Sequence, residues 1–180
     1  MNKVSRLLLA LLVVSLAVFV ACKGEKEEEQ DQFTMVVYPG ARLLPHLTDL
    51  TKQAHKIVSP NDPEAPQIAI YDTDASVDDV ANFYVKAYGY GSVAPDATNN
   101  LSAAKPPAYR RTGDLLADQK GAEPLFPKLN LHPDLSKASG SYNAVEIAPK
   151  MNRPRVTIQR PYFDVTTSQQ VNRTLILMSR

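Results

Sequence analysis

The sequence contains little of the chemistry that marks common enzymes and metal proteins. It has one cysteine, so it can form neither an internal disulfide nor a Cys-rich zinc site, and it has no C-x-x-C redox pair. The motifs G-x-S-x-G, H-E-x-x-H, the P-loop and G-x-G-x-x-G are all missing. The sequence has three histidines, His46, His55 and His132, and they lack the local spacing of metal ligands. These absences argue against catalysis and leave open only a Ser/His/Asp arrangement that is assembled in space.

An excess of one charge is also lacking. Lys and Arg number 20 against 19 Asp and Glu, which gives a formal net charge of +1. No strongly basic field is available to attract phosphates, so we expect no nucleic-acid partner. The hydrophobic share of 44% and the charged share of 22% are typical of a globular protein.

The first 21 residues have the layout of a secretory signal peptide. Lys3 and Arg6 form a positive start, and residues 7–21 are apolar apart from Ser15. A transmembrane helix is the alternative interpretation. A helix over residues 7–21 would be about 22 Å long, which is short of the roughly 30 Å hydrocarbon core of a bilayer. The pattern therefore favours a signal peptide.

The single cysteine directly follows this apolar run. The segment Val18-Phe19-Val20-Ala21-Cys22 resembles the lipobox of bacterial lipoproteins, with Phe19 where Leu is usual. The resemblance implies cleavage between Ala21 and Cys22, diacylglycerol on the Cys22 sulfur and an N-acyl chain such as palmitate on its amine. An ordinary secretory cut after Ala21 would need a small residue at position 19, and Phe19 is large. Two or three acyl chains would anchor the protein stably to a membrane.

Residues 23–32 contain no apolar side chain and carry a net charge of −3. Such a segment cannot bury a core, so we expect a disordered acidic tether that holds the domain off an anionic membrane. Lys23 follows the cysteine where inner-membrane lipoproteins often have Asp, so the resemblance favours the periplasmic face of the outer membrane. The predicted organisation is a signal peptide over 1–21, a lipidated cysteine and tether over 22–32, and one domain over 33–180.

The domain has the pattern of an α+β protein. A run over 33–38 stopped by Pro39-Gly40 predicts a strand and a turn, and residues 42–58 fit either a helix or part of a hairpin. Residues 76–88 predict the main helix, capped by Ser76 and ended by Gly89. We expect a long covering loop over 89–140 with a short helix at 114–120. The remaining strands are expected at 68–71, 142–148, 156–163 and 174–178, the last three as a meander. The expected fold is an antiparallel sheet of about five strands with one main helix on one face.

Two motifs in this domain carry a second resemblance. Val37-Tyr38-Pro39-Gly40-Ala41 is followed by Ser76-Val77-Asp78-Asp79-Val80 and Phe83-Tyr84. This looks like a domain of uncharacterised bacterial lipoproteins with "YPGA" and "S-V-D-x-V-x-x-F-Y" patterns. The resemblance supports the fold and an envelope location, implies no activity, and favours a hairpin over 53–72.

Two charged clusters are candidate sites. The acidic cluster consists of Asp72, Asp74, Asp78 and Asp79. It could hold calcium, but no glycine lies in the loop and no bidentate Glu follows. Helix capping and the helix dipole explain these acids better. The basic cluster could contact anionic lipid, lipopolysaccharide or another polyanion, or could only protect a sheet edge; it consists of Arg153, Arg155 and Arg160.

Together these patterns favour a membrane-anchored envelope lipoprotein that acts as a non-catalytic binding or structural module. Its expected partners are the membrane, through the lipid, and an envelope protein or an anionic glycolipid. We expect no cofactor and no metal. Two alternatives remain: a carrier or sensor of an apolar or anionic ligand with 89–140 as a lid, and an envelope hydrolase without a recognisable motif.

Overall fold

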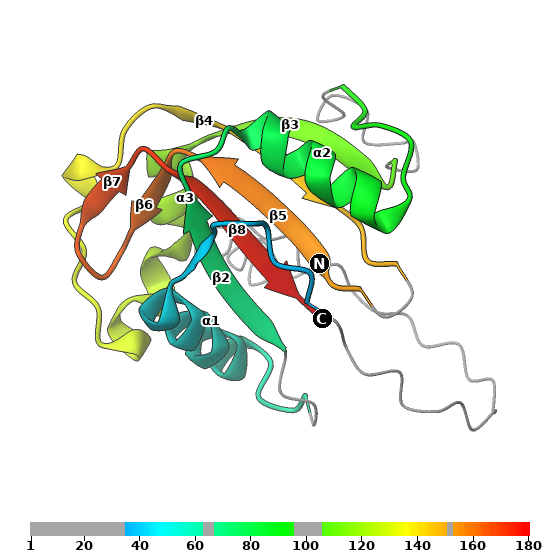
Figure 1. Cartoon of the computed structure of the whole chain (residues 1–180). Helices are drawn as coiled ribbons and strands as arrows, with labels where there is room; N and C mark the ends of the chain where they lie inside the picture. The colour runs from blue at the N-terminus through cyan, green and yellow to red at the C-terminus, as the bar shows by residue number, and fades with distance from the viewer. Residues whose placement is uncertain (1–34, 63–66, 96–105, 151–152) are drawn as a thin grey trace.

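The computed structural model describes residues 35–62, 67–95, 106–150 and 153–180 (Figure 1). The predicted signal peptide over 1–21, the predicted cleavage and lipidation site at Ala21 and Cys22, and the predicted tether lie outside these residues. Within the described part of the chain, no helix is both long and apolar enough to cross a bilayer.

The described residues form a mixed α+β fold around a six-stranded antiparallel sheet (Figure 1). Its strand order is β1-β2-β8-β5-β4-β3, and every neighbouring pair is antiparallel. The strands are β1 (Arg42–Leu43), β2 (Ile68–Thr73), β3 (Ala108–Asp114), β4 (Ser141–Ile147), β5 (Arg155–Arg160) and β8 (Thr174–Ser179). A separate hairpin joins β6 (Tyr162–Asp164) to β7 (Gln169–Val171). The expected neighbour order is confirmed, since β5 lies between β4 and β8 in the sheet. The strand expected over 156–163, however, ends at Arg160, and the β6–β7 hairpin stands between β5 and β8 in the chain.

The central position of β8 follows from its sequence. Ile176 and Met178 belong to the core beneath α2, whereas Leu177 belongs to the core on the other face. Because side chains alternate along a strand, a strand that is apolar at every position must be covered on both faces. β8 lies between β2 and β5, as the apolar pattern predicts.

Three α-helices occur in the described residues, so the expectation of one main helix on one face is wrong. α2 (Val77–Tyr88) covers one face, and the core of the other face includes side chains of α1 (Pro45–Val58) and α3 (Leu115–Ala122). The ambiguous segment 42–58 is therefore mostly helix, and the hairpin favoured for 53–72 is wrong. Pro45 occupies the first helical turn, where a missing N–H costs nothing.

α2 forms as its sequence predicts. The Ser76 hydroxyl accepts a hydrogen bond from the Asp79 N–H at 3.1 Å and donates one to the Asp79 carboxylate at 2.6 Å. Gly89 ends the helix in the left-handed conformation at φ 67°. The predicted stripe is buried in full; it consists of Val77, Val80, Ala81, Tyr84 and Tyr88.

The long loop expected over 89–140 is also wrong. Its described residues contain the edge strand β3, the helix α3 and three short 3-10 turns at Glu123–Leu125, Pro127–Leu129 and Leu135–Lys137. β3 lacks an apolar alternation because Arg110 and Arg111 are held by acids on opposite faces of the sheet. α3 matches the short helix expected over 114–120. Asp114 is its cap, since its carboxylate accepts from the Ala117 N–H, and the helix continues to Ala122.

A side chain of α1 closes the outer edge of β2 next to β1. The Ile70 carbonyl accepts from the Leu44 N–H at 2.8 Å, and the Ile70 N–H donates to the Thr48 hydroxyl at 3.0 Å in a buried position. An edge strand with unpaired backbone groups would be open to association with another chain. Thr48 thus satisfies a buried donor where the short β1 does not reach.

We expect Thr48→Val to lower the free energy of unfolding by about 1–3 kcal/mol, because it leaves the buried Ile70 N–H without an acceptor. Thr48→Ser keeps the hydroxyl and should retain most of this stability. Urea unfolding of the two variants checks the prediction. An unchanged stability of Thr48→Val, which keeps the methyl group, together with a loss in Thr48→Ser would show that packing of the methyl group, rather than the hydrogen bond, matters here.

Candidate functional site

The first motif of the domain is a tight turn. The Ala41 N–H donates to the Tyr38 carbonyl at 3.0 Å, and Gly40 has φ 76°. Proline at the second and a glycine of positive φ at the third position define a type II turn. The turn predicted at Pro39-Gly40 is confirmed, whereas the described residues before it, 35–38, do not form the expected strand.

The turn packs on the second motif, which belongs to α2. The Tyr38 N–H donates to the hydroxyl of Tyr84 at 3.2 Å, and the Tyr38 ring meets the Phe83 ring edge-on with centroids 5.2 Å apart. Tyr84 is fully buried, and burial raises the pKa of its hydroxyl far above the usual range. The two motifs are therefore joined by a hydrogen bond from backbone to side chain and by an aromatic pair.

A surface hollow of about 420 Å³ lies where the two motifs meet. Aromatic and proline side chains form its apolar part, and polar side chains of α2 form the rest; its lining is Tyr38, Pro39, Asp79, Asn82, Phe83 and Lys86. Within the described residues, neither Asn82 nor Lys86 has a side-chain hydrogen bond or ion pair. The hollow therefore offers an amide and a cation beside an exposed apolar surface. We call it the α2 hollow.

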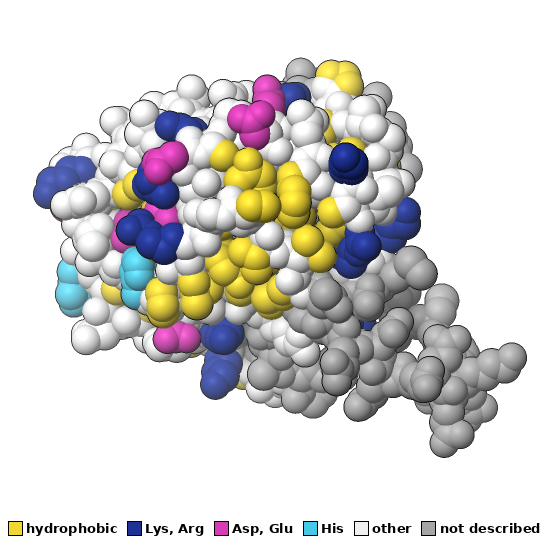
Figure 2. Space-filling view, in the orientation of Figure 1, with side chains coloured by type: hydrophobic (Ala, Val, Ile, Leu, Met, Phe, Trp, Pro, Cys, Tyr) yellow, Lys and Arg dark blue, Asp and Glu magenta, His cyan; other side chains and the backbone are white. Residues whose placement is uncertain are grey.

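The α2 hollow belongs to a wider apolar face of the domain. Figure 2 shows apolar side chains gathered over α2 and over the segment that leads into β1. Two large side chains here are markedly exposed, Val37 in that segment at 38% and Leu43 in β1 at 47%. Contiguous exposed apolar surface, unlike scattered single residues, is typical of binding sites.

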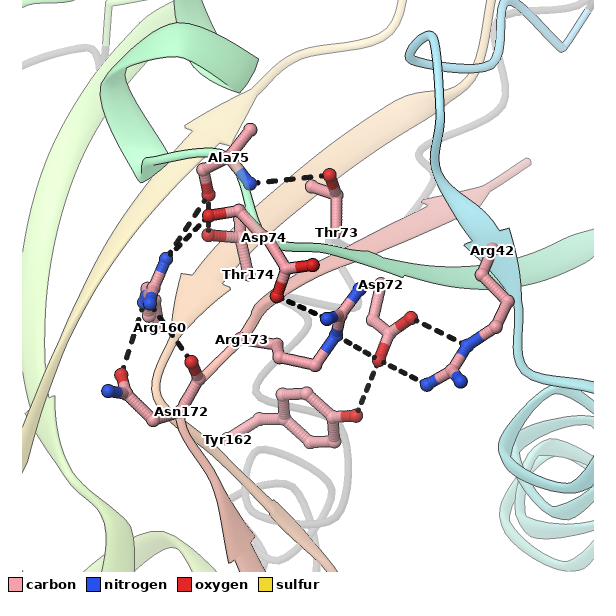
Figure 3. A network of polar contacts seen from close by, with 10 residues as sticks. All are labelled: Arg42, Asp72, Thr73, Asp74, Ala75, Arg160, Tyr162, Asn172, Arg173 and Thr174. Carbon is pink, nitrogen blue, oxygen red and sulfur yellow. Dashed lines mark hydrogen bonds and ion pairs between the residues drawn. The ribbon is translucent and has the colours of Figure 1, made fainter.

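The predicted basic cluster does not assemble into one site. Arg160 is held by the backbone, since its Nη1 donates to the carbonyls of Asp74 and Ala75, and its Nε donates to Asn172 (Figure 3). Arg155 stands at the other end of β5, and alternation places its side chain on the opposite face. Arg153 lies over the ring of Tyr88, with 5.3 Å from its guanidinium carbon to the centroid.

The acidic cluster is neutralised by arginines. Asp72 is fully buried and accepts from Arg42 at 3.0 and 3.2 Å, from Arg173 at 2.9 Å and from the Tyr162 hydroxyl at 3.3 Å (Figure 3). Asp74 pairs with the same Arg173, while Asp78 pairs with Arg110 at 2.6 Å. The capping interpretation is confirmed for Asp79, but it missed the arginines that bind the other three carboxylates.

Nothing in this arrangement favours calcium. Among the described residues, no three His, Cys, Asp or Glu side chains are placed to hold a metal ion. The fork of Arg42 already occupies both oxygens of Asp72. The ion pairs instead tie β1 and the turn before β8 to the end of β2.

The histidines lie in three different environments. His46 Nε2 is 3.1 Å from Asp164, His55 Nε2 is 3.9 Å from Asp62, and His132 is exposed. Burial of Asp164 opposes its ionisation, but hydrogen bonds from Thr166 and the contact with His46 outweigh it and lower the carboxyl pKa. In the described part of the chain, no serine, threonine or cysteine donates to His46, so the His–Asp pair there has no nucleophile.

A buried polar network on the face opposite α2 was not predicted. Glu146 is fully buried, accepts from Arg111 Nε at 2.9 Å and accepts from the Thr157 hydroxyl at 2.7 Å. Arg111 Nη1 also donates to the Tyr142 hydroxyl at 2.6 Å, which donates to Asp118 at 2.5 Å. Burial raises the pKa of both Tyr142 and Asp118. The network links β3, β4, β5 and α3, and its internal pairing marks it as structural.

Comparisons of the chain with models of protein families, with curated proteins and with solved structures find no match.

Proposed function

We propose that this chain is a bacterial envelope lipoprotein, anchored through Cys22, whose domain is a non-catalytic binding module. The α2 hollow is its binding site, and the partner is an envelope protein. The observation that carries the proposal is the pairing of an apolar hollow with two polar side chains, Asn82 and Lys86, that have no partner among the described residues.

The polar clusters elsewhere support a binding role over a catalytic one. The carboxylates of Asp72 and Glu146 are committed to arginines, and His46 is committed to Asp164. A catalytic site instead needs a nucleophile or a proton-transfer group that is free to reach a substrate.

The carrier alternative loses its main support. It required residues 89–140 to act as a lid over an apolar cavity. The described residues 108–114 are instead paired along their length with β4, and Leu115, Leu125, Phe126 and Leu129 belong to the core. This segment builds the domain, and the α2 hollow lies outside it.

The chemistry of the α2 hollow specifies the partner. Tyr38 and Phe83 provide room for one large apolar side chain, and Lys86 provides a cation for a neighbouring carboxylate. The described residues begin at Met35, thirteen residues after Cys22. Even a fully extended chain between these two residues would span at most about 45 Å. The partner is therefore a protein close to the anchoring membrane that presents an apolar side chain beside an acidic one.

A crosslinking pull-down of the lipidated protein from intact bacterial cells tests this proposal. We expect Lys86→Glu to reduce recovery of the crosslinked partner at least tenfold, because a carboxylate would then face the acidic residue of the partner. Lys56→Glu is the matched control, since Lys56 is also an exposed cation in the last turn of a helix. Equal recovery with the two variants would refute the α2 hollow as the binding site.

A further inference from the structure

We infer that the domain has a second contact surface, a basic and aromatic corner that rests on anionic phospholipid headgroups. The corner consists of the partly exposed Tyr90, Lys150 and Arg153, with the buried ring of Tyr88 beneath Arg153, at the C-terminal end of α2. It deepens the proposed function, because it would fix how the anchored domain faces its membrane.

The corner is built by two tyrosines of α2 and its C-terminal extension. The Tyr88 hydroxyl donates to the Pro154 carbonyl at 2.9 Å, and the Tyr90 hydroxyl donates to the Ala148 carbonyl at 3.2 Å. These bonds bring both ends of the connection between β4 and β5 against the end of the helix. The rings of Tyr88 and Tyr90 themselves lie 6.2 Å apart.

Each ring carries a cation. The ammonium of Lys150 lies 5.0 Å from the centroid of Tyr90, and the guanidinium of Arg153 lies 5.3 Å from that of Tyr88. A backbone bridge between Lys150 and Arg153 holds the two cations side by side. Cation–π contacts of this kind position a charge without neutralising it.

These charges lack acidic partners. Neither Lys150 nor Arg153 forms an ion pair with a described residue, and the same holds for Arg155, which starts β5 nearby. The arginines at the other end of β5 are held by partners within the domain. Arg160 is hydrogen-bonded to the backbone, and Arg173 forms ion pairs with Asp72 and Asp74. The corner thus retains its positive charge, and that charge complements an anionic surface.

The side chains of the corner and its position in the domain both fit contact with a lipid surface. The partly exposed ring of Tyr90 beside Lys150 and Arg153 suits the interface between headgroups and acyl chains, where one end of each side chain is apolar and the other is polar or charged. The ring of Tyr88 is buried and supports Arg153 from the core side. In Figure 1 the described chain begins beside the end of β8, at the same end of the sheet as the start of β5. The segment that leads from the proposed anchor therefore enters the domain near the corner.

Binding of residues 33–180 to lipid vesicles tests this inference. All described strands and helices and both cores lie within this range. We expect sedimentation with vesicles of equal parts phosphatidylglycerol and phosphatidylcholine, and none with pure phosphatidylcholine. Because each cation near an anionic membrane contributes about 1 kcal/mol, Lys150→Gln and Arg153→Gln should each weaken binding about fivefold, and together about 25-fold.

The matched control is Lys128→Gln, an exposed cation of a 3-10 turn on the other face of the sheet. It should leave binding unchanged, and added salt should weaken the binding of the unaltered domain. Equal affinity for neutral and anionic vesicles, or an equal effect of Lys128→Gln, would overturn the inference. Such a failure would leave the partner pull-down unaffected, because Lys86 and the α2 hollow are tested there with separate variants.

Discussion

Glu146→Gln is expected to lower the free energy of unfolding by about 3 kcal/mol, the largest stability change that we predict for a single substitution here. Glu146 is fully buried on β4 and is the counter-charge of Arg111, which is itself only 18% exposed at its side chain. Removing one member of a buried ion pair leaves the other charge uncompensated, at a cost of about 3–5 kcal/mol. The lower end applies because Arg111 keeps its hydrogen bond to Tyr142.

The pKa of Arg111 supports this expectation. Burial opposes its charge, but Glu146 and Tyr142 outweigh that effect and raise the pKa. A guanidinium does not lose its proton in a protein, so Arg111 stays charged when Glu146 is neutralised and the protein cannot escape the cost by deprotonation. Urea unfolding, read as a shift of the midpoint at unchanged slope, measures the loss.

The double variant Glu146→Gln/Arg111→Met provides the control. It removes both charges and should recover most of the stability that Glu146→Gln loses, because an apolar replacement of a whole buried pair is often neutral. Additive losses in the double-mutant cycle would contradict the ion pair as the cause.

Cys22→Ala is expected to abolish attachment of the lipid. The reaction that the lipobox resemblance implies forms a thioether at the cysteine sulfur, and alanine has no nucleophile there. In a bacterial host fed labelled palmitate, label on the variant should fall to background. Because cleavage follows lipidation in this class of protein, the variant should also retain residues 1–21 when its N-terminus is determined by mass spectrometry.

Gly24→Ala is the control for this experiment, since it changes the same segment and keeps Cys22. It should be labelled and cleaved like the unaltered chain. Label that persists in Cys22→Ala would contradict the anchor, and cleavage without label would indicate an ordinary secreted protein.

The sequence predicts those elements whose stability is local. α2 carries its own cap, apolar stripe and terminating glycine within positions 76–89, so it could be placed almost to the residue. β8 is apolar on both faces and could be placed at the centre of the sheet for that reason. In both cases the pattern of a short segment determines its environment.

Elements that depend on distant partners were missed. β3 reads as a loop because its arginines resemble a solvated segment, and only pairing with β4 brings Arg111 to Glu146, 35 residues away. Arg173 reaches Asp72 only because β2 and β8 are antiparallel neighbours. Register across the sheet, which no local pattern contains, decides these contacts.

The candidate site was likewise predicted only in part from the sequence. The turn at Pro39-Gly40 and the helix stripe could each be read from the sequence, yet nothing in either showed that Tyr38 would pack on Phe83. The α2 hollow exists only through that contact. One signal was available. The turn motif and the helix motif occur together in the lipoprotein domain that the sequence resembles, and the Tyr38–Tyr84 hydrogen bond gives a physical reason for their association.

The most direct test of the central claim is site-specific photo-crosslinking in living bacterial cells. A photoreactive phenylalanine analogue is placed at position 83, in the α2 hollow, and separately at position 53, an exposed site on α1. We predict a discrete crosslinked protein from position 83, none from position 53, and loss of the product when Lys86→Glu is added. Equal products from both positions, or none from position 83, would contradict a binding module that acts through the α2 hollow.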